Sequence, residues 1–367
     1  MTVKRLGVAG ALIGSDLVVG DISIANGHIE AIGLSPRGTG LAIPGFVDPQ
    51  VNGFAGVDFL TATPQEVAEA GAALARTGVV AYQPTLITSR LQDTVSAAGI
   101  IREAVGLGRG ARIVGIHLEG PFLSPRRPGA HPPELLKSPD WEQIAPMLAA
   151  GPVTMVTLAP ELPGAREVIT RLVEGGVIVS LGHSDAKAQE ADQGFDAGAT
   201  AVTHLFNAMR PLSHRDPGIA GAALARSSIY LGVIVDGHHL ADETIITIWR
   251  AAAERMVVVT DAIAATGQGD GTWKLGEVSV EVKDGVARRS DGTLAGSVGT
   301  MDSSFRNLLD LGIPLPDVVA ATSHNARRLL GLPAGDLTKG AHADLVVVDD
   351  NYCVVRALIA GKERGEV

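Results

Sequence analysis

The feature that most constrains this fold is a regular alternation of apolar and helical segments between residues 41 and 337. The apolar runs have four to eight residues, as strands buried on both faces do, and the segments between them carry apolar residues at helical spacing. The eight predicted strands cover residues 41–48, 79–86, 112–119, 153–159, 177–183, 201–206, 229–236 and 256–262. Eight parallel strands joined by helices close most economically into an α/β fold of the (β/α)₈ type, a TIM-like barrel.

The two ends of the chain have a different pattern. Residues 1–40 contain short alternating runs around an Asn-Gly pair, and residues 338–367 have the same character. We therefore expect both termini to form one small β-sandwich domain beside a barrel over 41–337. Within the barrel, residues 274–295 interrupt the alternation and predict a β-hairpin insertion that turns at an Asp-Gly pair.

Charge and apolar content limit the partners of the chain. The formal net charge of −10 argues against nucleic acid and anionic membranes, and no apolar run approaches the ~18 residues of a membrane helix. The single cysteine, Cys353, excludes an intrachain disulfide and is expected in a buried strand. These features predict a cytoplasmic protein. Hydrophobic residues make up 46% of the chain. A parallel sheet buried on both faces explains part of this content, and a buried interface between subunits would explain the rest.

Polar side chains gather at the carboxyl ends of the predicted strands, which in such a barrel converge on the face that carries active sites. They are His117 and Glu119 after the third strand, His183 and Asp185 after the fifth, His204 and Asn207 after the sixth, Asp236, His238 and His239 after the seventh, and Asp261 after the eighth. Seven of the ten histidines lie between the third and eighth strands. This concentration makes a metal site the first hypothesis.

Glu119, His183 and His204 would supply one carboxylate and two imidazoles, a set that suits Zn²⁺ and leaves a fourth position open for water. A single histidine at a strand end is more often an ordinary hydrogen-bonded residue, so the prediction depends on the coincidence of all three. Asp261 would face the barrel mouth, where it could move a proton from water to a leaving amine. Alternatively, Asp261 caps the next helix.

The stretches GIHLEGPFLSP, GAHPP, GHSDA, THLFNAM, RDPGIAGA and GTLAGS resemble the N-acetylglucosamine-6-phosphate deacetylase family of the amidohydrolase superfamily. The resemblance extends over essentially the whole chain. It implies hydrolysis of N-acetylglucosamine 6-phosphate to glucosamine 6-phosphate and acetate, in amino-sugar catabolism and recycling. It also implies a homodimer and one divalent metal per subunit, with Zn²⁺ expected and Fe²⁺, Co²⁺ or Mn²⁺ as alternatives.

The resemblance assigns roles to individual residues. Glu119, His183 and His204 match the metal ligands, Asp261 matches the acid/base, and His131 matches a catalytic residue that polarises the acetyl carbonyl. Its implied substrate contacts are Ala130, His131, Asn207, Ala208, Arg215, His239, Leu294, Ala295, Gly296 and Ser297. Arg215 would bind the phosphate, because a guanidinium offers several donors to its oxygens.

One departure concerns the end of the first strand. Most amidohydrolases carry His-x-His there, whereas this chain has Gln50-Val51-Asn52. Amides are poor ligands for Zn²⁺, so we expect the first of two possible metal positions to be empty and Gln50 and Asn52 to hold a water there. Alternatively, the two amides only satisfy the backbone of a turn.

Three other functions remain open at this point. Deacetylation of N-acetylgalactosamine 6-phosphate differs at a single hydroxyl of the substrate. A cyclic-amide hydrolase of the dihydroorotase type would need His-x-His and usually a carboxylated lysine, and neither is found at the matching strand ends. A non-catalytic binding protein on the same barrel would be expected to have lost ligands, but all except the first pair are present.

Overall fold

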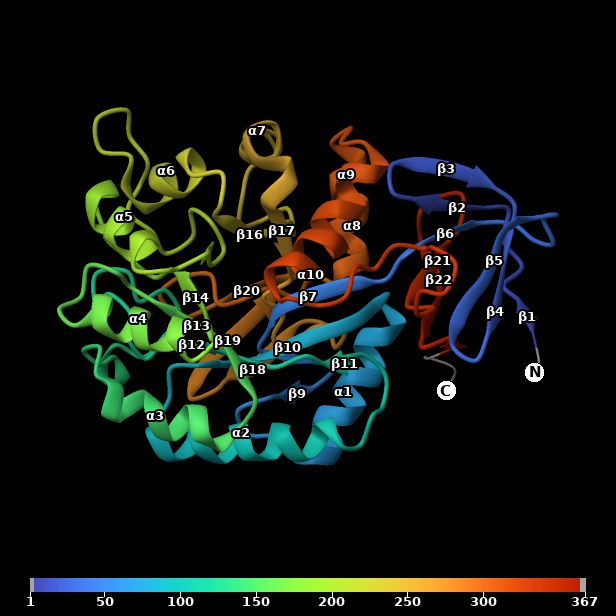
Figure 1. Cartoon of the computed structure of the whole chain (residues 1–367). Helices are drawn as coiled ribbons and strands as arrows, with labels where there is room; N and C mark the ends of the chain where they lie inside the picture. Colours follow the sequence, from blue (N-terminus) through green and yellow to red (C-terminus); the bar gives the residue numbers. More distant parts are fainter. Residues whose placement is uncertain (1–2, 364–367) are drawn as a thin grey trace.

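The computed structural model describes residues 3–363 and contains a barrel flanked by a smaller β-region that holds both ends of the chain (Figure 1). The barrel strands are β7 (Phe46–Val51), β10 (Val79–Ile87), β11 (Arg112–Ile113) continued by β12 (Ile116–Glu119), β13 (Val153–Leu158), β14 (Ile178–Leu181), β15 (Ala201–Val202), β16 (Tyr230–Ile234) and β17 (Met256–Val259). Neighbours in this order pair in parallel from β7 through β10 to β17. The predicted α/β barrel is confirmed.

The barrel closes between its first and last strands. Val51, the last residue of β7, forms a parallel bridge with Ala262, which lies just beyond β17, and the Asp261 backbone N–H donates to the Gln50 carbonyl at 3.0 Å. Asp48, at the centre of β7, accepts a 2.6 Å hydrogen bond from the hydroxyl of Thr260. Closure therefore brings the first and last strand ends, more than 200 residues apart in sequence, into direct contact.

Helices cover the outside of the barrel: α1 (Pro64–Arg76), α2 (Leu91–Val105), α3 (Trp141–Ala150), α4 (Ala165–Glu174), α5 (Ala188–Asp196), α6 (Gly218–Ala225), α7 (Asp242–Ala252), α8 (Met301–Asp310), α9 (Leu315–Val319) and α10 (Asn325–Leu329). Short 3₁₀ turns occupy Pro133–Leu135 and Ala253–Arg255, and a π-helical turn occupies Ala320–His324. Helix α1 begins with a capping box in which Thr63 and Glu66 bond reciprocally, a device that stabilises a helix start by about 1 kcal/mol. None of the helices within 3–363 is long and apolar enough to cross a membrane.

Two terminal sheets pack face to face. The larger has the order β23 (Lys362–Glu363), β22 (Val354–Ile359), β21 (Leu345–Val348), β6 (Leu41–Pro44), β2 (Gly10–Ile13) and β3 (Asp16–Val19). The smaller joins β1 (Lys4–Arg5), β4 (Asp21–Ala25) and β5 (His28–Leu34). Leu6, Val8, Ile22, Leu345 and Leu358 belong to the apolar cluster that these segments share. The expected pairing of both termini in one β-structure is confirmed.

The predicted strand over 41–48 is divided in the structure. Its first half, β6, pairs with β21 and β2 in the terminal sheet, and only β7 enters the barrel. The chain changes sheets at Gly45, where an added Cβ would lie 2.3 Å from a methyl group of Val80. Both halves are buried, so the apolar pattern runs through the change without a break. Cys353, expected in a buried strand, is half-buried in the loop between β21 and β22.

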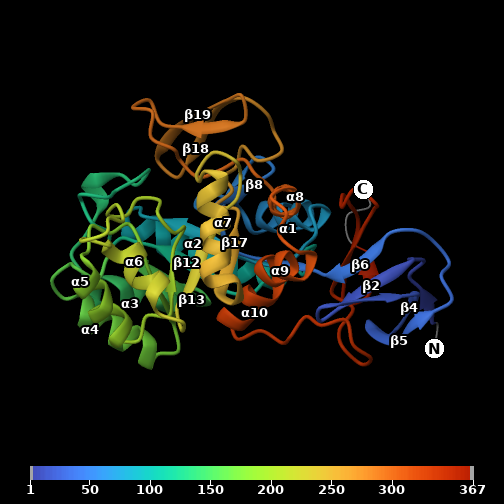
Figure 2. The same ribbon diagram turned by 90° about the horizontal axis from the view of Figure 1, so that it is seen from above.

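An antiparallel sheet follows the eighth barrel strand and stands apart from the ring of helices (Figure 2). It consists of β18 (Gly271–Leu275), β19 (Val278–Lys283) and β20 (Val286–Arg288), one strand more than the predicted hairpin. Asp284 and Gly285 form the turn between β19 and β20, both with positive φ. A further short ribbon pairs β8 (Gly53–Phe54) with β9 (Val57–Asp58).

Candidate metal centre and active site

The strand ends bring four predicted site residues together at the barrel mouth. Glu119 is the last residue of β12, whereas His183, His204 and Asp261 each lie two residues beyond their strands. The backbone φ angles of these last three are 47°, 30° and 52°, values that cost about 1–3 kcal/mol for residues other than glycine. Such strain indicates that the surrounding fold fixes these side chains. Asp261 does not cap a helix, since the next α-helix begins at Met301.

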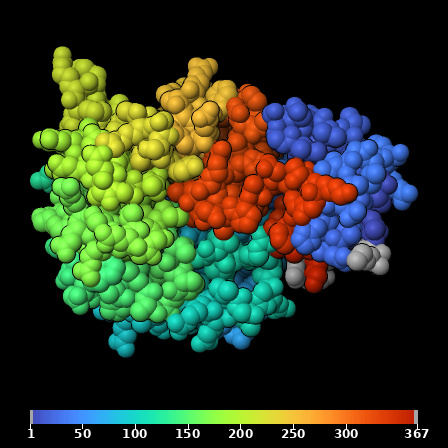
Figure 3. Space-filling model, viewed as in Figure 1, coloured from blue at the N-terminus to red at the C-terminus, as the bar shows by residue number. Residues whose placement is uncertain are grey.

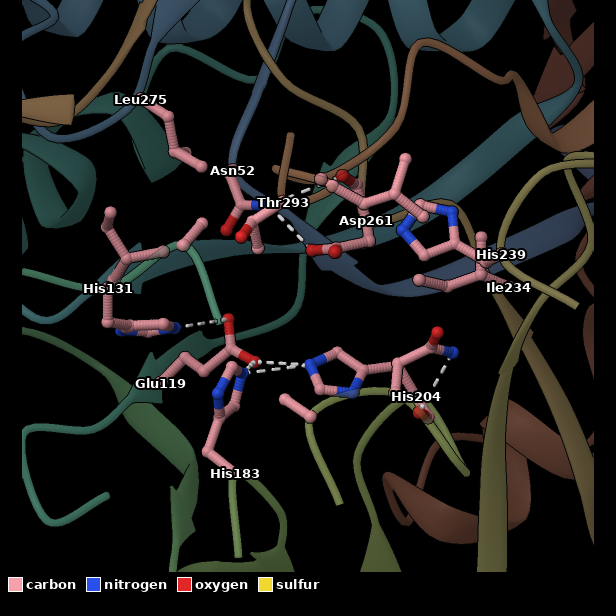
Figure 4. Close-up of a pocket in the computed structure, with 16 residues that line it drawn as sticks. Asn52, Glu119, His131, His183, His204, Ile234, His239, Asp261, Leu275 and Thr293 are labelled. Atoms are coloured by element: carbon pink, nitrogen blue, oxygen red, sulfur yellow. Dashed lines mark hydrogen bonds and ion pairs between the residues drawn. The ribbon is translucent and has the colours of Figure 1, made fainter. Parts of the chain in front are cut away.

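Glu119, His183 and His204 form a compact buried group whose candidate ligand atoms all lie within 4.8 Å of one another. The Nε2 atoms of the two histidines are 3.0 Å apart, and Glu119 Oε1 lies 3.2 Å from His183 and 3.0 Å from His204 (Figure 4). One carboxylate and two imidazoles at these separations fit a divalent metal ion.

The second nitrogen of His183 supports its role as a ligand. His183 Nδ1 lies 3.1 Å from the carbonyl oxygen of Arg127. A carbonyl only accepts, so Nδ1 carries the proton and Nε2 offers its lone pair to the group. Burial lowers the pKa of His183 to about 4, which leaves the ring neutral, the form that binds metals.

Gln50 and Asn52 contact the carboxylates of the site directly. Gln50 Nε2 donates to Glu119 Oε1 at 3.2 Å and to Asp261 Oδ1 at 3.1 Å, and Asn52 Nδ2 donates to Asp261 Oδ1 at 2.7 Å. Burial and the charge of Glu119 nevertheless raise the pKa of Asp261 to about 6. A carboxyl group with a pKa in this range can both accept and return a proton near neutral pH. The idea that the amides serve only a turn is wrong, and their expected role toward water stays a prediction.

His239 has a carboxylate partner that we did not predict. Its Nδ1 lies 2.7 Å from Asp236 Oδ2, and Asp236 Oδ1 accepts the backbone N–H groups of His238 and His239. Burial favours the neutral form of Asp236, but these bonds outweigh it and lower its pKa to about 2. The aspartate therefore holds the proton of His239 on Nδ1. The spacing of three residues between the two was a signal that the sequence offered.

A cavity of about 180 Å³ opens above these groups. The predicted site residues that line it are Asn52, Glu119, Ala130, His131, His183, His204, Asn207, Ala208, His239, Asp261, Leu294 and Gly296. Four lining residues were not predicted, namely Ile87, Ile234, Leu275 and Thr293. Leu275 and Thr293 come from the segment after the eighth strand; Thr293 lies in the GTLAGS stretch, which was a signal for it, whereas no motif marked Leu275. Two predicted contacts lie behind the wall: Ala295 is fully buried, and the hydroxyl of Ser297 donates to the Thr260 carbonyl.

Arg215 is exposed on the loop between β15 and α6 and is not among the residues that line the cavity. This loop projects from the body of the molecule (Figure 1; Figure 3). Its neighbour Asp216 accepts hydrogen bonds from Arg210, with Nε at 2.8 Å, so Asp216 is already paired. The chain therefore does not bring Arg215 to the groups at the barrel mouth.

Known proteins share this architecture. The model of the amidohydrolase family matches residues 41–364. N-acetylglucosamine-6-phosphate deacetylase of Homo sapiens is 42% identical over 337 residues, which cover 87% of this chain and 82% of the human protein. N-acetylgalactosamine-6-phosphate deacetylase of Escherichia coli O157:H7 is 35% identical over 93% of both chains.

A solved structure agrees over the full length. An Asp-to-Ala variant of N-acetyl-D-glucosamine-6-phosphate deacetylase from Mycobacterium smegmatis, in complex with N-acetyl-D-glucosamine-6-phosphate, superposes with a TM-score of 0.95. The two sequences are 37% identical, and the match covers both chains completely. The barrel, the buried group of Glu119, His183 and His204, and these similarities agree. The chain belongs to the amidohydrolase family, among its N-acetylglucosamine-6-phosphate deacetylases.

Proposed function

We propose that this protein hydrolyses N-acetylglucosamine 6-phosphate to glucosamine 6-phosphate and acetate, as a cytoplasmic step of amino-sugar catabolism and recycling. The observation that carries the proposal is the buried group of Glu119, His183 and His204, which lines one cavity with Asp261. The choice of substrate follows from the relatives that are 42% and 37% identical, which are named for N-acetylglucosamine 6-phosphate.

One divalent ion, with Zn²⁺ first among the candidates, would be held by Glu119, His183 and His204. When bound, such an ion lowers the pKa of a water and polarises a carbonyl oxygen. Gln50 and Asn52 occupy the sequence positions at which most amidohydrolases carry His-x-His, and their amide groups donate to the carboxylates of Glu119 and Asp261. We therefore propose one metal per subunit.

The remaining steps fall to side chains of this chain. Asp261 takes the proton of the attacking water and passes it to the departing amine, for which a pKa of about 6 is suitable. His131 donates a hydrogen bond to the acetyl carbonyl oxygen, on which negative charge develops. His239, held by Asp236, contacts a sugar hydroxyl.

Recognition of the phosphate is proposed for Arg215, with help from the backbone at Asn207 and Ala208. Because Arg215 lies outside the cavity, its loop must either close over the same chain or enter the pocket of a second copy. The proposed homodimer allows the second arrangement. Mixing an Arg215→Ala subunit with an Asp261→Asn subunit separates the two cases. Recovery of activity in the mixture supports entry from the second copy, and no recovery supports closure within one chain.

A second candidate substrate is N-acetylgalactosamine 6-phosphate, because a deacetylase named for it is 35% identical over 93% of the chain. Acetate release from N-acetylglucosamine and N-acetylgalactosamine, each with and without the 6-phosphate, tests both candidates. We expect the highest kcat/KM for N-acetylglucosamine 6-phosphate. Absence of acetate from all four compounds, with metal analysis showing a loaded site, would contradict the proposed function.

A further inference from the structure

The residue that follows β10, Thr88, lies against His131 at the edge of the cavity. Both side chains are buried, with 3% of each residue exposed. Thr88 presents its backbone N–H to His131 Nδ1 at 3.3 Å and its hydroxyl oxygen to the same nitrogen at 2.9 Å. His131 itself belongs to the loop after β12, so its ring is oriented by a neighbouring strand end rather than by its own segment.

The backbone N–H decides which nitrogen of His131 carries the proton. A backbone N–H can only donate, so Nδ1 must offer a lone pair and the proton of the neutral ring must sit on Nε2. His131 Nε2 lies 3.7 Å from Glu119 Oε2, an acceptor, which favours the same tautomer (Figure 4). The Thr88 hydroxyl can then act as a second donor to Nδ1.

The backbone around this contact is shaped to allow it. A Cβ on Gly120 would lie 2.2 Å from Thr88 Oγ1, so glycine at that position leaves room for the hydroxyl. Arg289 Nη1 lies 3.3 Å from the carbonyl oxygen of Gly129 and holds the His131 loop from the other side. The loop is thus fixed between β10 and the segment after β20.

We propose that Thr88 is a positioning residue that fixes the tautomer of His131, with Nδ1 as the acceptor and the proton on Nε2, directed into the cavity as a hydrogen-bond donor. The catalytic part of this inference rests on the proposed function, in which that donor meets the acetyl carbonyl oxygen. A histidine with the other tautomer would present a lone pair to the carbonyl and repel it. Thr88 therefore determines whether His131 can stabilise the developing charge.

Two substitutions at one position test this role. Thr88→Val keeps the branched shape and the backbone N–H but removes the hydroxyl. We expect kcat to fall by about fivefold to tenfold, the usual effect of one buried hydrogen bond, with KM within about twofold. Thr88→Ser, which restores the hydroxyl, should recover most of the loss. Thr322→Val is the matched control, because it removes a buried hydroxyl bonded to the Val318 carbonyl, away from the cavity.

A competing role for the hydroxyl is structural, since Thr88 Oγ1 also lies 3.3 Å from the Glu119 carbonyl oxygen. If that contact matters more, Thr88→Val should lose metal along with kcat. A normal metal content with reduced kcat supports positioning of His131, and loss of metal in proportion to kcat overturns it. An unchanged kcat in Thr88→Val also overturns the proposal.

The tautomer can be read without any substrate. Nuclear magnetic resonance of ¹⁵N-histidine protein distinguishes a protonated from an unprotonated ring nitrogen, and a His131→Gln variant identifies the signals. We expect an unprotonated Nδ1 in the wild type and, because the backbone N–H remains, the same tautomer in Thr88→Val, which loses only the second donor to Nδ1. A proton on Nδ1 in the wild type would overturn the inference. Should the wild type release no acetate, the proposed function fails while this measurement still decides the tautomer.

Discussion

The acetyl end and the phosphate end of the proposed site are built in different ways. At the acetyl end, strands β12, β14 and β15 deliver three buried side chains whose ligand atoms lie within 4.8 Å of one another, and Asp261 follows β17; three of these four residues have strained backbone conformations. At the phosphate end, Arg215 is exposed on a projecting loop outside the cavity. Reacting groups must be held accurately, which rigid strand ends allow, whereas a charged contact tolerates a mobile support. In the proposed site, one chain supplies the acetyl end from its own strands, whereas recognition of the phosphate is assigned to a loop.

The largest effect is expected at the acetyl end. Asp261→Asn keeps the shape of the side chain but removes the base. General acid–base groups contribute about 10²–10⁴-fold, so kcat should fall by that range while metal content stays normal. The loss should be equal for phosphorylated and unphosphorylated N-acetyl sugars, measured by acetate release. A near-normal kcat would show that another group moves the proton.

A smaller and more selective effect is expected at the phosphate end. Loss of one partner of a desolvated charge pair costs about 2–5 kcal/mol, so Arg215→Ala should lower kcat/KM for the 6-phosphate substrate by roughly 30-fold or more. The unphosphorylated sugar should hardly be affected, because it never made the contact. Equal losses for both substrates would mean that Arg215 supports the loop and would remove the difference between the two ends.

A third prediction concerns Asn52, which contacts the proposed base at the acetyl end. Asn52 donates a 2.7 Å hydrogen bond to Asp261, which lowers the pKa of that carboxyl against the upward effect of burial. In Asn52→Leu the pKa should rise, so more Asp261 is protonated and unable to act as base at a given acidic pH. The acidic limb of the kcat/KM profile should move to higher pH, with a loss of about tenfold below pH 6. An acidic limb that stays at the same pH would show that Asn52 does not control the pKa of Asp261.

The smallest expected change is in metal content. Elemental analysis of the active wild type should give one ion per subunit, because Gln50 and Asn52 offer amides rather than imidazoles. Replacing both by histidine should raise the count toward two. Two ions in the wild type, both needed for turnover, would show that the first position can be filled without histidines.

The oligomeric state of the protein affects only the phosphate end of the proposed site. Sedimentation equilibrium should give a dimer at micromolar concentration if the Arg215 loop serves a second copy. An active monomer whose Arg215→Ala variant still loses phosphate selectivity would place the contact within one chain.

The sequence by itself determined the barrel and the ligand group. Apolar runs that end in Glu119, His183, His204 and Asp261 mark both the strands and the face on which the side chains meet, because parallel strands share one carboxyl edge. The expected substrate came from the resemblance of the surrounding motifs to a known family. Neither inference required knowledge of contacts between distant segments.

Only the tertiary structure decided which atoms meet across the barrel. Gln50 and Asp261 are 211 residues apart, and their contact depends on how β7 closes against β17. The pairing of Thr88 with His131 joins a strand end to a loop, and the passage of β6 into the terminal sheet is hidden in an unbroken apolar run. Local patterns report burial and periodicity, whereas these contacts depend on strand register and closure, which no single segment encodes.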